Sequence, residues 1–263
     1  MRVPRALTIA GSDSGGGAGI QADLKTFVMH GVHGMSALTA LTAQNTIGVQ
    51  GVSEVPPEFV RQQIASVATD IGVDAAKTGM LSSAPIIEAV AEAIAEHGIG
   101  NVVCDPVFVS KHGDALLAES AVDALRTKLL PLATVITPNV PEAAGLLSRA
   151  ISSDEPDEDA ARDLARLGPR WVLLKGGHLT SDNAVDLLTD GTQVIRLEAA
   201  RVRTKHTHGT GCTLSAALCA NLAKGLDVTD AAREAKKFVT RAIERHLSIG
   251  GGIGPVNPAW GLW

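Results

Sequence analysis

The chain has 263 residues, enough to bury a substantial core, and its 45% apolar and 19% charged residues are typical of a globular protein. A net charge of −5, with four Phe, three Trp and no Tyr, argues against nucleic-acid binding, which uses basic surfaces and stacking aromatic rings. The first residues carry too short an apolar run for a signal peptide, and no later run approaches the ~18 residues of a membrane span. No two of the three cysteines lie within four residues of each other, so we expect neither zinc nor disulfides, and a reducing cytoplasm.

Short apolar runs alternate with segments of helical periodicity along most of the chain. Strands are expected at residues 6–10, 36–43, 73–76, 102–104, 133–136 and 171–174. Helices are expected at residues 20–29, 58–69, 85–96, 121–130, 160–167 and 229–246, with another beginning near residue 212. An Asp-Gly pair between residues 185–188 and 194–197 is typical of a β-hairpin. We expect the acidic run 154–159 to be a solvated loop, and the Gly- and Pro-rich residues 249–263 to be an ordered surface loop.

This alternation predicts a single α/β domain over residues 1–263, with a doubly wound, mostly parallel sheet covered by helices on both faces. Ligands of such sheets gather at the carboxyl ends of the strands. The residues expected at those ends are Gly11, Asp13, Gln44, Asn45, Lys77, Asp105, Asn139 and Lys175. One polar strand end means little, but this succession of cations, carboxylates and amides predicts a lined site.

Residues 204–217 (TKHTHGTGCTLSAA) are a polar, glycine-rich loop that runs into a helix. The first N–H groups of a helix are unpaired and point toward one place, so Gly209 and Gly211 would let a phosphate approach them closely. Cys212 would lie in the first turn, where the helix dipole favours the thiolate. The alternative is an ordinary turn capped by Thr210, with Cys212 buried behind it.

A second glycine-rich loop, GSDSGGGAG at residues 11–19, follows the first strand. It lacks the Lys of a phosphate-binding P-loop and the glycine spacing of a dinucleotide site, which argues against a dinucleotide-dependent oxidoreductase. Either a ligand lies against this backbone, or the loop is only a tight turn.

The expected lining suits phosphate chemistry. Asp105 and Glu142 are carboxylates of the kind that hold Mg²⁺ together with phosphate oxygens and water. Lys175 would place a positive charge against a polyphosphate, and Gln44 would present a donor and an acceptor to an amino-substituted heterocycle. Taken singly, each has an alternative: a turn residue for Asp105, a first-turn charge for Glu142, a solvated tip for Lys175 and a satisfied strand-end amide for Gln44.

Several motifs, in one order along nearly the whole chain, resemble those of the hydroxymethylpyrimidine/phosphomethylpyrimidine kinase family of the ribokinase-like superfamily. They are IAGSDSGGGAGIQADLKTF (9–27), ALTAQNT (40–46), KTGML (77–81), DPV (105–107), TPNVPEA (137–143), KGGH (175–178) and HGTGCTLSAA (208–217). The resemblance implies a ribokinase-like fold and two ATP-dependent phosphorylations in thiamine biosynthesis. The first acts on 4-amino-5-hydroxymethyl-2-methylpyrimidine, and the second converts its monophosphate into the diphosphate.

The resemblance also implies a role for each motif residue. The aminopyrimidine would be held by Gln44 and Asp23, in a pocket lined by Gly11, Met80 and Val107. Mg²⁺ would be held by Asp105 and Glu142, and the nucleotide phosphates by Asn139 and Lys175. The anion hole would be formed by the amides of Gly209, Thr210, Gly211 and Cys212. Most of the superfamily has an Asp base where this chain has Cys212, so its thiolate would accept the hydroxymethyl proton in the first reaction.

Two departures from the family pattern, His112 and the pair Asn257-Pro258, touch none of these residues. The family also suggests a homodimer. Two rival functions remain open: a pyridoxal kinase, since relatives with a Cys in this loop phosphorylate pyridoxal, and a non-catalytic protein that binds a vitamin. Met80 and Gln44 favour the pyrimidine, and the intact Asp105 and Cys212 argue against the non-catalytic protein.

Overall fold

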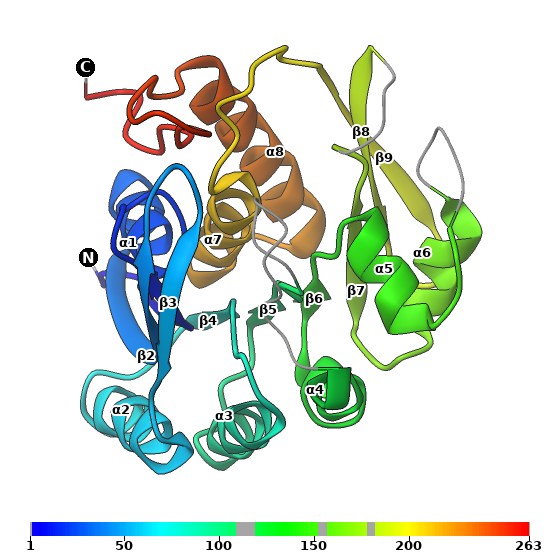
Figure 1. The fold of residues 1–263 in the computed structure, drawn as a ribbon. Coiled ribbons are helices and arrows are strands. Elements are labelled where there is room, and N and C mark those ends of the chain that lie inside the picture. The colour runs from blue at the N-terminus through cyan, green and yellow to red at the C-terminus, as the bar shows by residue number, and fades with distance from the viewer. Residues whose placement is uncertain (1, 109–118, 152–156, 178–181, 263) are drawn as a thin grey trace.

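The computed structural model describes residues 2–108, 119–151, 157–177 and 182–262. Its centre is a nine-stranded sheet with the order β3-β2-β1-β4-β5-β6-β7-β8-β9 (Figure 1). The strands are β1 (Arg5–Asp13), β2 (His33–Gln44), β3 (Val49–Glu54), β4 (Ala75–Thr78), β5 (Val102–Cys104), β6 (Val135–Ile136), β7 (Trp171–Lys175), β8 (Asn183–Thr189) and β9 (Val194–Ala200). Neighbouring strands in the series β2-β1-β4-β5-β6-β7 pair in parallel. Strand β3 is antiparallel to β2, and β8 is antiparallel to both β7 and β9.

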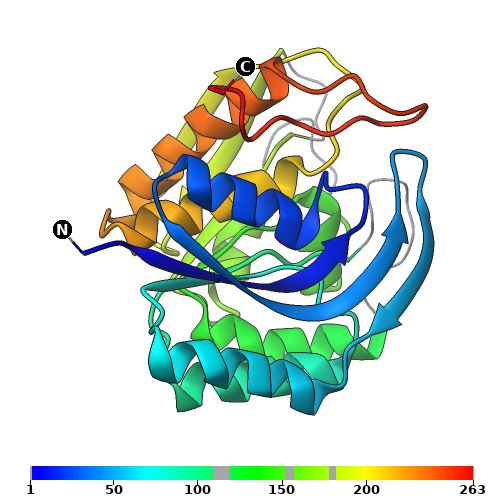
Figure 2. The same cartoon turned by 90° about the vertical axis from the view of Figure 1, so that its left-hand side faces the viewer.

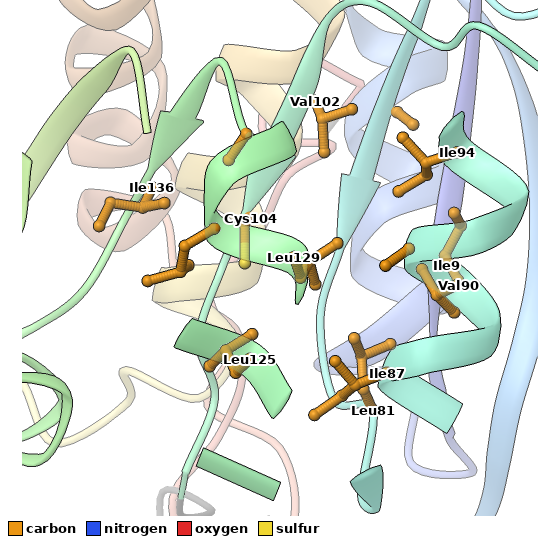
Figure 3. Packing of buried hydrophobic residues seen from close by; sticks show 14 of the residues in the cluster. Ile9, Leu81, Ile87, Val90, Ile94, Val102, Cys104, Leu125, Leu129 and Ile136 are labelled. Carbon is orange, nitrogen blue, oxygen red and sulfur yellow. The ribbon is translucent and has the colours of Figure 1, made fainter. Parts of the chain in front are cut away.

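Helices cover both faces of this sheet. They are α1 (Gly19–Met29), α2 (Pro57–Asp70), α3 (Ala84–Glu96), α4 (Glu119–Ala124), α5 (Val140–Leu147), α6 (Glu158–Ala165), α7 (Thr210–Ala223) and α8 (Val228–Glu244). One hydrophobic cluster joins the sheet to α2 through α6, and a second joins it to α1, α7 and α8. Figure 3 shows side chains of the first cluster, among them Ile9, Val102 and Ile136 of the strands and Ile87, Val90 and Ile94 of α3. Each such buried aliphatic side chain stabilises the fold by ~1.5–3 kcal/mol.

The strand order places a crevice at the middle of the sheet. From β1 the chain crosses to β2 on one side, and it later returns to β4 on the other side. Connections that diverge from neighbouring parallel strands leave space beyond their carboxyl ends, which is where open α/β sheets bind ligands. The residues after β1 and β4 therefore border the natural binding site of this fold.

The expected alternation of strands and helices is confirmed, as is the β8–β9 hairpin around the Asp-Gly pair. The expected strand 73–76 lies two residues further on, so Lys77 and Thr78 belong to β4. The expected helix 121–130 is α4 followed by a π turn (Leu125–Leu129) and a 3₁₀ turn (Leu130–Leu132). Strand β3 was not expected, because its residues are nearly all exposed and carry no apolar pattern. Half of the acidic run, residues 154–156, lies outside the described residues, as do His112 and His178. The other half is not a loop: Asp157 caps α6, and Glu158 and Asp159 form its first turn.

The description of residues 249–263 as a surface loop is wrong for its central part. Residues 254–258 are buried, because their backbone pairs with interior segments. Asn257 N–H donates to the Ala242 carbonyl of α8, and the Trp260 ring lies 6.2 Å from the Phe238 ring. In the part of the chain that the structure describes, no helix is both long and apolar enough to cross a membrane.

Candidate active site

A cavity of about 830 Å³ opens at the carboxyl ends of the parallel strands. It brings together residues from distant parts of the chain that the sequence predicted to share one site. These residues are Gly11, Gln44, Met80, Asp105, Val107, Asn139, Glu142, Lys175, Gly209, Thr210, Gly211 and Cys212. The shared cavity favours a common role over the separate alternatives that each residue has on its own.

The amino end of α7 faces this cavity, as the sequence predicted. Gly209 is the residue before the helix, with φ of +79°, and its Cα lies against the backbone of Gly17, so a side chain there would overlap that carbonyl. Thr210 does not cap the helix; its hydroxyl donates to the Thr207 carbonyl at 2.8 Å. Among the described residues, no acceptor pairs with the N–H of Gly211 or Cys212. These amides are therefore available to an anion in the cavity.

The expectation that Cys212 is a thiolate is wrong for this structure. Burial raises the pKa of the Cys212 thiol to about 11, and the nearby Lys77 ammonium offsets only part of that rise. The residue remains partly exposed because it lines the cavity. Desolvation of the anion, together with the nearby Asp23 and Asp105 charges, outweighs the Lys77 ammonium, so the thiol is protonated at neutral pH.

Side chains of alternating charge lie along one side of the cavity, and all but Asp23 line it. We call Asp23, Lys77, Asp105, Lys175 and Glu142 the charge row. Lys175 Nζ is 2.9 Å from Asp105 Oδ1 and 3.8 Å from Glu142 Oε2. Thr137 donates to Asp105 at 2.8 Å, and Ser215 of α7 donates to its other oxygen at 3.3 Å. Burial disfavours the charge, yet Lys175 and Lys77 hold the pKa of Asp105 below its usual value.

Glu142 combines a structural contact with a position in this row. Its carboxylate accepts from the Asn139 N–H at 2.7 Å, while the Asn139 side-chain oxygen accepts from the Glu142 N–H at 2.9 Å. This reciprocal pair forms the capping box that begins α5. The Asn139 side-chain NH₂ is still able to donate into the cavity. Burial, reinforced by Asp105 and opposed by Lys175, raises the pKa of Glu142 to about 7.

Asp23 does not line the cavity, contrary to the expectation that it contacts the aminopyrimidine. It is fully buried, and its carboxylate pairs with the equally buried Lys77 at 2.8 and 3.1 Å and accepts from Thr8 at 2.6 Å. Burial works against the Lys77 ammonium, but the surrounding acidic groups raise its pKa above the usual value. Asp23 therefore supports Lys77, which is the member of the pair that reaches the cavity.

Two buried polar pairs that border the cavity were not expected from the sequence. His208 Nε2 lies 2.9 Å from Asp13 Oδ2, and the Asp13 carboxylate also accepts from three backbone N–H groups of residues 15–18. Lys236 of α8 donates to Asp186 of β8 at 2.7 Å. Asp13 and His208 lie inside the two glycine-rich motifs, so only their pairing was missed. Asp186 and Lys236 lie in elements whose patterns look purely structural.

No group of three or more His, Cys, Asp or Glu side chains within the described ranges is arranged to hold a metal ion. Asp105 and Glu142 provide two carboxylates at the cavity. Two carboxylates suit a cation that completes its coordination with phosphate oxygens and water, as Mg²⁺ does.

Known proteins are similar to this chain in sequence and in fold. Residues 13–257 match the family model for phosphomethylpyrimidine kinase. A hydroxymethylpyrimidine/phosphomethylpyrimidine kinase of Streptomyces coelicolor is 58% identical over 98% of this chain and 96% of its own length. One of Bacillus subtilis is 51% identical over 98% and 95%. The structure of an ADP complex of Bacillus subtilis pyridoxal kinase has a TM-score of 0.91 and 43% identity, and the match covers 99% of both chains. This chain, by these matches, belongs to the phosphomethylpyrimidine kinase family.

Proposed function

We propose that this protein transfers the γ-phosphoryl group of ATP to the hydroxymethyl group of 4-amino-5-hydroxymethyl-2-methylpyrimidine, and then a second one to the resulting monophosphate. The carrying observation is the single cavity that joins Gln44 to the unpaired amides at the start of α7. A heterocycle bound at Gln44 would present its hydroxymethyl group to a phosphoryl group bound at the α7 amides. Thiamine biosynthesis uses the diphosphate product.

The first step needs an acceptor oxygen aligned with the γ-phosphorus. That oxygen forms a bond to phosphorus while the bond to the bridging oxygen of ADP breaks, and ADP leaves with the electron pair. The hydroxyl proton passes to the small fraction of Cys212 that is ionised, and the amides of Gly209, Gly211 and Cys212 stabilise the charge on the transferring group. In the second step the acceptor is an ionised phosphate, so no base is required and positioning dominates.

At the other end of the acceptor pocket, Gln44 is held for recognition. Its backbone N–H donates to the Ser14 hydroxyl, which donates in turn to the Gln44 carbonyl, both at 2.8 Å. The Thr42 hydroxyl donates to the Ser12 carbonyl at 2.7 Å and lies 3.2 Å from the Gln44 side-chain oxygen, and the Gln44 side-chain NH₂ would face a ring nitrogen. Met80 and Val107 supply the apolar walls.

The charge row supports a nucleotide that binds together with Mg²⁺. Its members are Asp23, Lys77, Asp105, Lys175 and Glu142. When all are ionised they carry three negative and two positive charges, so the row alone does not attract a polyphosphate. Asp105 and Glu142 would hold the cation, with Lys175 and Asn139 on the phosphates, and bound Mg²⁺ would neutralise charge on the transferring group. The ADP complex of the Bacillus subtilis pyridoxal kinase supports nucleotide binding in this fold.

The rival substrate is pyridoxal, because the fold itself is shared with a pyridoxal kinase. Sequence favours the pyrimidine: in the same organism, identity is 51% to the pyrimidine kinase and 43% to the pyridoxal kinase. A coupled assay of ADP release should give a higher kcat/KM for the hydroxymethylpyrimidine than for pyridoxal, and turnover that requires Mg²⁺. A higher kcat/KM for pyridoxal would overturn the assignment. Pyrimidine binding without turnover would instead support the non-catalytic protein.

We also propose that the protein is a homodimer. Strand β3 ends the sheet, and the β2–β3 hairpin carries Leu41, Ile47 and Val52, each more than half exposed. An unpaired edge with exposed apolar side chains is typical of an interface. Sedimentation should show a dimer for the native chain and a monomer for Leu41→Lys/Val52→Lys. Val28→Lys, a matched change at an exposed residue of α1, should leave the dimer intact. A monomeric native chain would contradict this proposal.

The free thiols of Cys104, Cys212 and Cys219 are consistent with a reducing compartment, and we propose the cytoplasm.

A further inference from the structure

The glycine-rich segment near the carboxyl terminus contacts both ends of the acceptor pocket. Ile253 N–H donates to the Thr46 carbonyl at 2.8 Å, and Gly252 N–H donates to the Thr46 hydroxyl at 3.2 Å. Thr46 is two residues from Gln44, so these bonds fix the turn that carries the recognition amide. Figure 2 shows the red carboxyl-terminal segment reaching from α8 to the tip of the β2–β3 hairpin. We call residues 252–256 the carboxyl-terminal bridge.

The other end of the carboxyl-terminal bridge holds the loop before α7. Gly254 N–H donates to His206 Nδ1 at 3.0 Å, His208 N–H donates to the Gly254 carbonyl at 3.2 Å, and Val256 N–H donates to the His208 carbonyl at 3.0 Å. His208 directly precedes Gly209, the first residue of the proposed anion hole. The bridge thus runs from the recognition turn to the phosphoryl site.

Two further contacts close this chain of bonds into a ring. The His208 side chain meets Asp13, whose carboxylate fixes the first glycine-rich loop. Ser14 in that loop then bonds to the Gln44 backbone. Neither hydrophobic cluster, as far as the described residues go, includes a residue of the bridge. Its bonds to Thr46, His206 and His208 go to loops of the site, while the Pro255 carbonyl accepts from Leu247 just after α8, so the bridge ties those loops to the helix.

We propose that the carboxyl-terminal bridge is a positioning element for phosphoryl transfer, which sets the separation between Gln44 and the amides at the start of α7. The inference rests on the proposed function. Transfer depends steeply on the alignment of acceptor and phosphorus, and a misplacement of ~1 Å can cost ~100-fold in rate. A bridge bonded to both loops holds that alignment before the ligands arrive.

Gly252 provides the direct test. A Cβ at this position would overlap the Thr46 carbonyl oxygen and lie 2.6 Å from its carbon, whereas ordinary contacts begin near 3.4 Å, so the turn and the bridge must separate by ~1 Å or more. Gly251, its neighbour, has open space where a Cβ would lie and is the matched control. Thr46→Val is a second variant, since it keeps the branched shape and removes only the hydroxyl that accepts from Gly252.

We expect Gly252→Ala to raise the KM of the hydroxymethylpyrimidine and to lower kcat, with a combined loss of ~10- to 100-fold in kcat/KM. Thr46→Val should shift both in the same direction by a few-fold, and Gly251→Ala should match the native enzyme. The dissociation constant for ADP should stay within about twofold throughout, because ADP lacks the phosphoryl group that the bridge aligns. Calorimetric titration with the pyrimidine alone should show the same weakening without turnover.

The proposal is overturned if Gly252→Ala and Thr46→Val both keep the native kinetics, or if ADP affinity falls by the same factor as pyrimidine affinity, which a general loss of structure would cause. If Gly252→Ala does not fold, Thr46→Val alone decides. If the native enzyme and Gly251→Ala transfer nothing to the pyrimidine, the proposed function fails. Weaker pyrimidine binding in Thr46→Val would then still support the bridge.

Discussion

The raised pKa of Cys212 makes a quantitative prediction about the first phosphorylation. If the thiolate accepts the hydroxymethyl proton, the rate must follow the fraction of enzyme in which Cys212 is ionised. The acceptor of the second phosphorylation is already an anion, so that step should not follow it. The two steps of one enzyme should therefore respond differently to pH.

The size of the effect follows from the pKa. With a value of about 11, the thiolate fraction rises tenfold per pH unit, from roughly 1 in 3,000 at pH 7.5 to roughly 1 in 30 at pH 9.5. The first step should accelerate ~100-fold across that interval. Bound nucleotide phosphates would raise the thiol pKa further and leave this slope unchanged. Glu142, with a pKa of about 7, is already about three-quarters ionised at pH 7.5, so its titration adds little to this slope.

Rapid-quench single-turnover rates for both acceptors at five pH values would measure these slopes. Cys212→Ala should remove the pH dependence of the first-step rate and should slow the first step more than the second. Cys212→Asp should give a fast, flat first step, because a carboxylate is ionised throughout the interval. A flat first step in the native enzyme, or equal losses in both steps for Cys212→Ala, would refute the base role and leave Cys212 as a packing residue.

Two further predictions concern the charge row. Because the pKa of Glu142 is about 7, only about a tenth of it is ionised at pH 6, so the KM for Mg²⁺ should be about tenfold higher at pH 6 than at pH 8. Glu142→Gln should raise that KM at pH 8 and remove its pH dependence; a persisting dependence would assign the titration to another group. Lys77→Met should lower the free energy of unfolding in urea by ~3–5 kcal/mol, because it leaves the Asp23 carboxylate buried without its cation. The double variant Lys77→Met/Asp23→Leu should recover part of that loss, and no loss in Lys77→Met would mean that Asp23 is neutral.

Much of the site could be predicted because strand ends are visible in the sequence. An apolar run that stops at Asp105 or Lys175 marks the edge of a parallel sheet, and all such edges face one cavity. The Gly209 turn was visible for a similar reason, since a polar glycine loop preceded an apolar helix. These features are local in the chain, so local patterns reveal them.

What was missed depends on contacts between distant residues. Asp23 was placed with the substrate, but its partner is Lys77, 54 positions away, and only the fold brings them together. The pKa of Cys212 depends on how much water the completed cavity excludes. The carboxyl-terminal glycines contact Thr46 across 206 positions, so their composition alone looked like a loop.

The capping box of α5 carries an evolutionary consequence. Gln at position 142 would still present an oxygen to the Asn139 N–H, so the helix would begin as before, while the negative charge would vanish. A lineage released from selection for phosphoryl transfer could thus lose the charge without losing the fold. Among diverged relatives, that one-letter change would mark chains that retain vitamin binding but have abandoned the reaction.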